Sequence, residues 1–385
     1  MGAGRYKYWI LKTTSMVINI VRYALIVTSL FVAAQVSNSE KIEQKSAPYD
    51  RQLTILFAGD IMQHGPQIIA AWDDSTGTYN YDPCFQYIAP IVGSKDIAIA
   101  NLEVTLAGKP FTGYPQFSAP DELAVAARNA GFDVLATANN HSCDRGDAGV
   151  LRTIKVLDSI GIRRTGTFAD SADYRSRHPL IITQNDITVA LLNYTYGTNG
   201  LPFNYPAMVN TIDEQRLIDD LAYSRGLNPD FILVFLHWGN EYELLPSSIQ
   251  QKLAALCREN GADAVIGSHP HVVQPMEYYT AVDSTQRNHL LVYSLGNYVS
   301  NQRDRYRDGG AMVSFTLLKT WNRKTIVNPE YHLTWVNTPV VNGKKIYNIL
   351  PASLPDTTAP AMKTFINDTR ERLNQWPNAI PEAAN

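Results

Sequence analysis

Carboxylate and imidazole side chains recur directly after short apolar stretches of this sequence. Six of them could bind a metal ion or transfer a proton: Asp60, Glu103, His141, His237, His269 and His271. Asn140 adds an amide oxygen beside His141. Calcium prefers oxygen ligands alone, so this mixture of nitrogen and oxygen donors favours manganese, zinc or iron. The residue types therefore predict a site for divalent metal ions.

The segment His269-Pro270-His271 is the most specific part of this pattern. On an extended backbone, side chains at positions i and i+2 point the same way. A proline restricts the residue before it to extended geometry. We therefore expect an extended segment with both imidazoles on one side.

Taken singly, the other candidates have structural alternatives. Asp60 could cap a turn or a helix, and Glu103 could be a solvated side chain. His237 could be a core histidine that bonds to the backbone. The segment 139–141 could be a tight turn, because Asn tolerates left-handed geometry. The metal site is thus predicted from the whole set and from no single residue.

The elements that must position these residues follow from an alternation of short apolar stretches with helical ones. Strands are expected at residues 53–58, 97–100, 134–136, 187–194, 231–236, 264–266 and 290–294. Helices are expected at 121–130, 147–160, 211–225, 247–259 and 358–374, and antiparallel strands between 311 and 335. This order predicts an α/β domain. Ligands bind beyond the carboxyl ends of strands in open α/β sheets, so we expect the candidate residues to converge there.

The composition excludes some functions. The 385 residues carry a net charge of −3, and four of the cations lie in the first 36 residues, which contain no acid. The acidic remainder argues against nucleic acid as a partner, because phosphate neutralisation needs clustered Lys and Arg. The cysteines, Cys84, Cys143 and Cys257, have no C-x-x-C spacing, so a thiolate zinc site is not expected. One disulfide is possible, and sequence cannot pair it.

Residues 1–36 have the pattern of a secretory signal or an N-terminal membrane anchor. A basic flank precedes an apolar run at 23–34, and residues 37–52 then read as a polar linker. Twelve helical residues span about 18 Å, which is short for a bilayer core of about 30 Å. A buried helix of the folded domain is the third alternative. A signal or an anchor would place the rest of the chain outside the cytoplasm, in the periplasm or at the cell surface.

Several segments, taken together in order and spacing, resemble the CapA family of poly-γ-glutamate and capsule synthesis proteins. They are Gly59-Asp60-Ile61-Met62, Asn101-Leu102-Glu103, Ala138-Asn139-Asn140-His141 with Asp144 and Gly146, His237-Trp238-Gly239, Gly267-Ser268-His269-Pro270-His271 and Tyr293-Ser294-Leu295-Gly296-Asn297. The resemblance extends from about residue 53 to residue 300. The family is similar to the calcineurin-like metallophosphoesterases, which implies a sandwich of two mixed sheets flanked by helices. We expect that domain at 53–340, with 341–385 as a peripheral C-terminal extension.

The resemblance also implies roles for the candidate residues in a site for two metal ions. The ligands would be Asp60 and His271 for the first ion, Asn140, His237 and His269 for the second, and Glu103 between the two. His141 would be the general acid, oriented by Asp144. Met62 stands where the phosphoesterases have a histidine, and His64 is a possible additional ligand.

Three functions remain open at this point. The chain could be a metal-dependent hydrolase or transferase that acts on a phosphoester or an anionic polymer intermediate in capsule biosynthesis. It could instead be a non-catalytic subunit that binds or exports such a polymer beside membrane partners, or a secreted binding protein with a degenerate site. Cys143 is an alternative nucleophile. The residues that could line a substrate groove, or be ordinary surface, are Tyr114, Trp238, Tyr242, Arg303 and Arg305.

Overall fold

The computed structural model describes residues 50–281, 287–341, 343–354 and 359–384. The expected signal or anchor at 1–36 and nearly all of the linker at 37–52 lie outside these ranges, and the first strand already begins at Arg51. Within the described ranges, no helix combines the length and hydropathy that crossing a membrane would require.

The first sheet has eight strands and carries the N-terminal half of the candidate site. Its order is β20-β17-β16-β1-β4-β5-β6, with β15 also paired to β1. Strands β1, β4, β5 and β6 run parallel to one another. Strands β16, β17 and β20 each pair antiparallel with their neighbours. The strands are β1 (Arg51–Ile61), β4 (Ile97–Leu102), β5 (Val134–Ala136), β6 (Arg163–Thr165), β15 (Asn297–Val299), β16 (Gly309–Lys319), β17 (Lys324–Asn337) and β20 (Asn348–Pro351).

The second sheet has six strands and carries the remaining candidate residues. Its order is β13-β14-β12-β11-β9-β8, with a parallel centre and antiparallel edges. The strands are β8 (Leu180–Gln184), β9 (Ile187–Thr195), β11 (Phe231–His237), β12 (Ala264–Ser268), β13 (Met276–Tyr279) and β14 (His289–Val292). Short pairs add β2 (Trp72–Asp73) with β3 (Thr78–Tyr79), β7 (Thr167–Phe168) with β10 (Met208–Val209), and β18 (Val340–Val341) with β19 (Lys344–Lys345).

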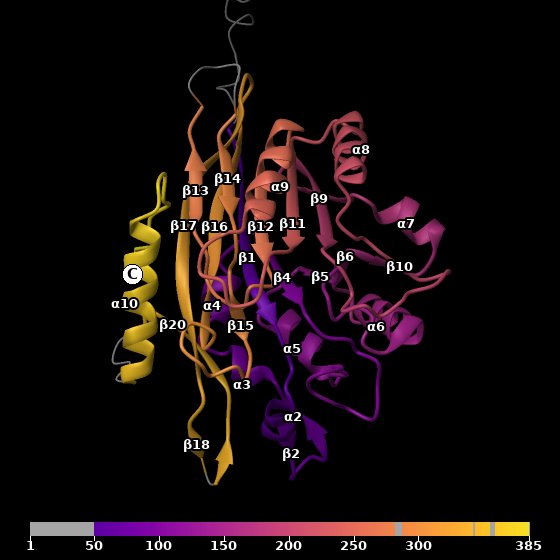
Figure 1. Ribbon diagram of the computed structural model, residues 1–385, viewed down its shortest axis with the longest axis vertical. Helices are drawn as coiled ribbons and strands as arrows, with labels where there is room; N and C mark the ends of the chain where they lie inside the picture. Colours follow the sequence, from indigo (N-terminus) through magenta and orange to yellow (C-terminus); the bar gives the residue numbers. More distant parts are fainter. Residues whose placement is uncertain (1–49, 282–286, 342, 355–358, 385) are drawn as a thin grey trace, which may run out of the picture. The chain divides into compact units, whose positions relative to one another are not determined.

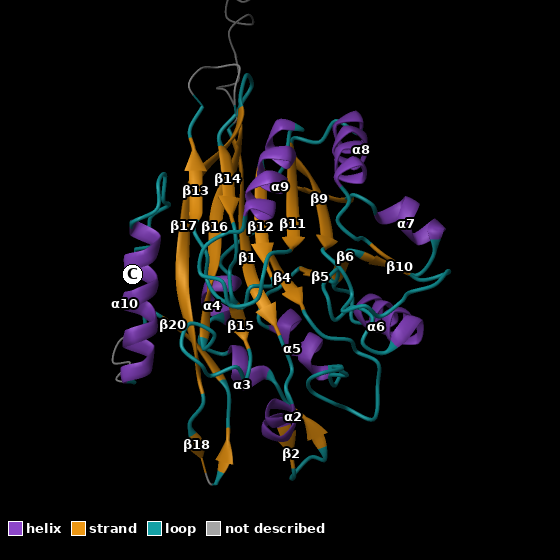
Figure 2. Ribbon diagram, viewed as in Figure 1, coloured by secondary structure: helices purple, strands orange, loops and turns teal. Residues whose placement is uncertain are grey.

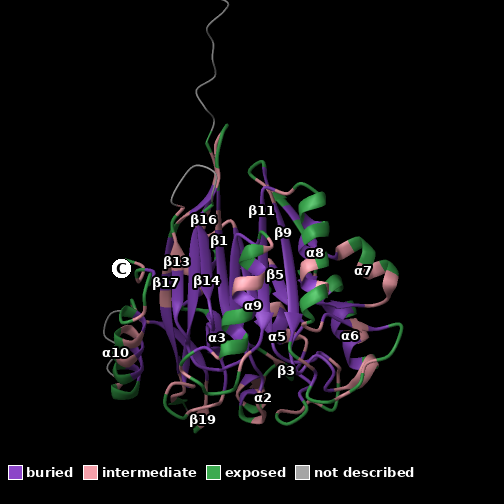
Figure 3. Ribbon diagram, turned by 45° about the horizontal axis from the view of Figure 1, so that its top comes forward, coloured by how far each residue is buried: buried purple, intermediate pink, exposed green. Residues whose placement is uncertain are grey.

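The two sheets face each other across the main hydrophobic core. Alternate residues of β1, including Leu53, Ile55 and Phe57, enter this core with Leu233 and Phe235 of β11. The rings of Phe57 and Phe235 meet edge to face at 5.3 Å. Figure 3 shows most of the central strands buried, with exposed residues on the outer sides of the helices. Two mixed sheets flanked by helices are the fold that the family resemblance implied, and they agree with the α/β class that the order of elements predicted.

Helices cover the outer faces of both sheets (Figures 1 and 2). Those around the first sheet are α2 (Gly65–Ala71), α3 (Asp82–Phe85), α4 (Ala89–Val92), α5 (Glu122–Asn129) and α6 (Gly146–Ser159). Those of the second half are α7 (Ser171–Arg177), α8 (Glu214–Gly226) and α9 (Ser248–Glu259), with α10 (Pro360–Asn374) at the C-terminus. Helix α9 begins at a capping box, in which Ser247 and Gln250 each satisfy a backbone amide of the other.

The C-terminal segment, expected to be peripheral from residue 341 onward, is instead part of the domain. Strand β20 pairs with β17, and α10 buries Met362 and Phe365 in the core between the sheets. Residues Asp50–Asn385 form one compact unit. The helix expected at 358–374 is present as α10, but the prediction that the segment is peripheral was wrong, because the pairing of β20 and the burial of α10 depend on residues far away in the chain.

Candidate metal centre

The candidate residues follow strands whose carboxyl ends meet at one end of the two sheets. Asp60 is the next-to-last residue of β1, and Glu103 directly follows β4. Asn140 and His141 follow β5 in the same sheet, whereas His237 ends β11 in the other sheet. His269 and His271 follow β12. Parallel strands bring these ends together, as the sequence predicted.

A close backbone contact sets the position of Asp60. A Cβ atom on Gly59 would lie 2.0 Å from the carbonyl oxygen of Gly296, so only glycine fits there. The amide of Asp60 donates to that same carbonyl at 3.0 Å, and the pairing of β1 with β4 shifts register at this point. This explains the Gly-Asp pair of the sequence, because the glycine lets the strand approach and the bulge turns the carboxylate toward the site.

His271 forms the closest ionic contact with Asp60. Its Nδ1 lies 3.2 Å from Oδ2 of Asp60, and its Nε2 lies 3.8 Å from Oε1 of Glu103. Burial lowers the pKa of His271, but the charges of Glu103 and Asp60 outweigh it and raise that pKa to about 9. Burial raises the pKa of Asp60, and the contact with His271 brings it below its usual value. In the metal-free chain, Asp60 and His271 therefore form an ion pair closed to solvent.

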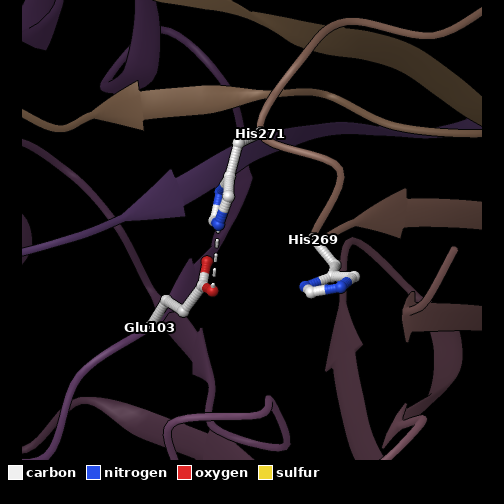
Figure 4. Close-up of side chains that lie close together, drawn as sticks. All are labelled: Glu103, His269 and His271. Atoms are coloured by element: carbon white, nitrogen blue, oxygen red, sulfur yellow. Dashed lines mark ion pairs between the residues drawn. The ribbon is translucent and has the colours of Figure 1, made fainter. Parts of the chain in front are cut away.

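Glu103, which follows β4 of the first sheet, is fully buried beside imidazoles from the second sheet. Its Oε1 lies 3.5 Å from Nε2 of His237 and has no hydrogen-bond partner among the described residues. Burial first, and the charge of Asp60 second, raise the pKa of Glu103 well above its ordinary value. Figure 4 shows the carboxylate of Glu103 and the ring of His271 pointing toward each other, with His269 beside them. Two buried carboxylates so close together need a cation to remain charged.

His237 and Asn140 join the two sheets. Nε2 of His237 lies 2.8 Å from Oδ1 of Asn140, and Nδ1 lies 3.0 Å from the hydroxyl of Ser268. Burial lowers the pKa of His237 to about 3, so the ring is neutral and has a lone pair for a metal ion. An imidazole whose second nitrogen is held by a neighbour is the usual arrangement of a metal ligand.

His269 lies in the cluster, but not through the extended backbone that we expected. His269 and His271 have φ values of 100° and 58°, so both adopt left-handed conformations that are unfavourable for residues with a side chain. Their rings still lie near each other, with centroids 5.9 Å apart. Nδ1 of His269 is buried without a hydrogen-bond partner. Strained backbone of this kind is concentrated at functional sites, where the surrounding structure maintains it.

His141 and Asp144 form a pair beside the cluster. Nδ1 of His141 lies 2.8 Å from Oδ2 of Asp144, which also accepts the backbone amide of Phe117 at 2.7 Å. The ring of Phe117 packs edge-on against that of His141 at 4.6 Å. With Nδ1 held by Asp144, Nε2 is the nitrogen of His141 that is left for a substrate.

Asn101 has a central position that the sequence did not reveal. Its amide nitrogen donates to Oδ1 of Asp60 at 2.8 Å and lies 3.2 Å from Nδ1 of His237. Its own oxygen accepts from Asn139 at 3.2 Å. The available signal was its spacing, because residues two apart at a strand end share a side and Asn101 precedes Glu103 by two.

Other sequence candidates lie outside the cluster. His64 precedes α2, where its Nδ1 lies 3.3 Å from both Gln67 and the amide of Asn301. Among the described residues, His64 is not part of a group whose ligand atoms lie close enough together to hold a metal ion. The three cysteines are buried free thiols, and burial raises the pKa of Cys143 to about 12, which disfavours a thiolate nucleophile. Trp238 is buried and cannot line a groove, whereas Tyr114 and Tyr242 are exposed.

The donor set fits metal ions. Among the residues that the structure describes, two groups have ligand atoms within 4.8 Å of one another, namely Glu103 with His269 and His271, and Asp60 with Glu103 and His237. Glu103 is common to both. The unpartnered Oε1 of Glu103 and Nδ1 of His269 are buried lone pairs that a cation would satisfy. Carboxylate and imidazole donors together suit transition metals.

These features define an α/β domain of two mixed sheets with a buried carboxylate–imidazole cluster at its strand ends. The sequence model of the bacterial capsule synthesis protein family, PGA_cap, matches residues 54–302, and the chain belongs to that family. The resemblance to CapA is thereby confirmed.

Two curated relatives and one solved structure are similar to the chain. The capsule biosynthesis protein CapA of Bacillus anthracis is 28% identical over 90% of this chain and 78% of its own. The PGA biosynthesis protein CapA of Bacillus subtilis (strain 168) is 28% identical over 83% of this chain and 81% of its own. The calcineurin-like phosphoesterase YfkN from Bacillus subtilis has a TM-score of 0.42 and 12% identity, over 85% of this chain and 100% of that structure.

Proposed function

We propose that this protein is a metal-dependent hydrolase or transferase of capsule or poly-γ-glutamate biosynthesis that acts on a phosphoester or an anionic polymer intermediate. The observation that carries the proposal is the position of Glu103, which is shared by two groups of ligand atoms. A carboxylate between two ions is the arrangement of two-metal hydrolytic sites. Membership of the capsule synthesis family supports the biosynthetic context.

The two ions would be manganese, zinc or iron. Asp60 and His271 would hold one, and His237, His269 and Asn140 the other, with Glu103 between them. Such ions supply a hydroxide near neutral pH and offset the charge of a transferring group. This division between the two ions comes from the family resemblance, since the distances alone also group His269 with His271.

The chain itself would move the proton. His141 would donate from Nε2 to the leaving oxygen, while Asp144 accepts from Nδ1 and keeps the ring in the required tautomer and orientation. Phe117 packs against the imidazole and restricts its rotation. Asn101 would hold Asp60 and His237 in place through its amide group.

We also propose that the domain works outside the cytoplasm, in the periplasm or at the cell surface. The basic and apolar segment at 1–36 supports this location through its sequence. Partners in the membrane that synthesise or export the polymer would then be within reach. The second candidate function is that of a non-catalytic subunit that holds an anionic polymer. Metal ions bound by the same cluster would then bind the polymer without cleaving it.

The experiment measures bound metal in the full chain, purified without chelator, by mass spectrometry. A His269→Asn/His271→Asn variant should lose the metal, and His332→Asn, in β17, is the matched control. Turnover of a chromogenic phosphodiester by the loaded protein then separates the enzyme from the subunit. Absence of metal in the wild type after reconstitution with manganese, zinc and iron would reject the proposal.

A further inference from the structure

A groove of about 520 Å³ lies beside the His141–Asp144 pair and is not used by the site described above. It is formed by the start of α2 and by the loop that contains Phe111–Gln116, with Arg145 on one side. Two of its apolar side chains are largely open to solvent, Tyr114 at 74% and Ile69 at 70%. Exposed apolar residues gathered in one concave place are typical of a binding surface.

The groove is a fixed feature, because its loop has internal hydrogen bonds and packs closely against the start of α2. Thr112 and Ser118 exchange both backbone hydrogen bonds, at 3.0 and 2.9 Å, and the hydroxyl of Thr112 donates to the carbonyl of Gln116 at 2.6 Å. A Cβ atom on Gly113 would lie 2.3 Å from the amide nitrogen of Gly65. The loop and the helix therefore meet backbone to backbone, and little rearrangement is needed before a ligand binds.

Arg145 gives the groove its polarity. Among the described residues that line the groove, it alone carries a charge. Its Nη2 donates to the hydroxyl of Thr112, its buried Nε has no partner, and no ion pair links it to a carboxylate within the described part of the chain. A guanidinium that is held in place but lacks an anion can form a bidentate contact with a planar carboxylate.

One chain neighbour and one buried ring link the groove to the proposed acid. Arg145 follows Asp144 directly in the chain, and Tyr114 packs against Phe117 with ring centroids 6.4 Å apart. Phe117 in turn contacts the ring of His141. Because His141 would protonate the leaving group, this adjacency is the reason to assign the groove to that group.

We propose that this groove, termed here the Arg145 groove, binds the leaving portion of the substrate and selects one with an apolar or aromatic body that ends in a carboxylate. This inference rests on the proposed function, since it takes the cleaved bond to lie at the cluster. Tyr114 and Ile69 contact the body, and Arg145 pairs with the carboxylate. The single guanidinium matches one negative charge, which is why a carboxylate fits better than a doubly charged phosphate.

The test measures binding by calorimetry, with phosphonates that the enzyme cannot cleave and the full chain loaded with manganese. Methylphosphonate reports the cluster alone, and phenylphosphonate adds the aromatic body. 4-Carboxyphenylphosphonate adds the carboxylate, and its 4-carbamoyl analogue is the neutral control of the same shape. We expect the carboxylate to bind about tenfold more tightly than the carbamoyl group, which is the effect of one charge-assisted contact.

Two variants assign this gain to the groove. Arg145→Gln should abolish the preference for carboxylate over carbamoyl and leave the affinity for methylphosphonate unchanged. Tyr114→Ala, at an exposed position that does not threaten folding, should remove the advantage of phenyl over methyl. A carboxylate preference that is absent, or that survives in Arg145→Gln, overturns the inference while methylphosphonate still binds.

Failure of the proposed function gives a different result. In that case methylphosphonate does not bind to the loaded wild type at all. Benzoate alone then tests the groove, because it needs no metal. Benzoate-induced shifts in the NMR spectrum that vanish in Arg145→Gln retain the groove as a carboxylate site, and unchanged shifts reject it.

Discussion

Nε2 of His237 lies 2.8 Å from Oδ1 of Asn140, and this contact joins the end of a strand in one sheet to a loop of the other. The two residues are 97 positions apart in the chain. Both atoms are of the kind that binds a transition metal. Their approach shows that the site belongs to the sandwich as a whole and to neither sheet alone.

Replacement of Asn140 tests whether this amide is a ligand. Asn140→Ala should weaken metal binding by about 10–100-fold, the range seen when a metal site loses a supporting group. Calorimetric titration of the metal-free protein measures it. Asn199→Ala is the matched control, because its exposed side chain contacts Asn140 from the outer side at 3.3 Å and should change the affinity little. Equal affinities in wild type and Asn140→Ala would exclude the amide as a ligand.

Asp144 is expected to act through His141. Asp144→Asn retains an oxygen that can accept the amide of Phe117 but removes the charge beside the imidazole. Turnover of a chromogenic phosphodiester should fall by about 100-fold, within the range of proton-transfer catalysis, while metal content stays constant. A double variant with His141→Asn should be no slower than His141→Asn alone. Additive losses would show that Asp144 does not work through His141.

Asp230 should make the protein less stable in acid. Its carboxylate contacts the amines of Lys319 and Lys324 at 2.8 and 2.7 Å. Burial raises the pKa of Asp230, but these contacts bring it below its usual value. A folded-state pKa below the unfolded value contributes stability above about pH 3.9, and the contribution is lost as the pH falls through the folded pKa.

Asp230→Asn should therefore lower the free energy of unfolding by about 1 kcal/mol at pH 7, a modest value because the lysines are partly exposed. The loss should be smaller at pH 3, because the carboxyl group of Asp230 begins to protonate there. Urea denaturation at both pH values measures the difference. Glu214→Gln, which breaks an exposed pair with Lys252, should change little at either pH. A deficit that is the same at pH 3 and pH 7 would contradict the assignment to the charge of Asp230.

The C-terminal helix should be necessary for stability. Phe365 of α10 is buried in the core between the sheets, so Phe365→Ala should cost about 3–5 kcal/mol of unfolding free energy, the usual range for a large core deletion. Lys363→Ala, on the exposed side of the same helix, should have an effect below about 0.5 kcal/mol. Nearly equal denaturation midpoints for the two variants would show that α10 does not contribute to the core.

The sequence by itself determined the local elements and the residues that follow them. Runs of apolar residues gave β4, β5, β9 and β11 close to their observed bounds, because a buried parallel strand needs a continuous apolar run. The position of Asp60, Glu103 and His237 at strand ends followed from the same pattern. So did the expectation that they meet, since parallel strands end at a common edge.

The tertiary structure decided what local pattern cannot encode. The left-handed backbone at His269 and His271 overrides the extended preference of a residue before proline, because the backbone amide of His269 and the ring nitrogen Nδ1 of His271 both contact Oδ2 of Asp60 in β1. The central position of Asn101 depends on its contact with His237, which joins the end of β4 to the end of β11 in the other sheet. The burial of Trp238 and Phe365 likewise depends on partners far along the chain. Spacing within a segment limits which side chains share a face, but long-range packing alone decides which faces meet.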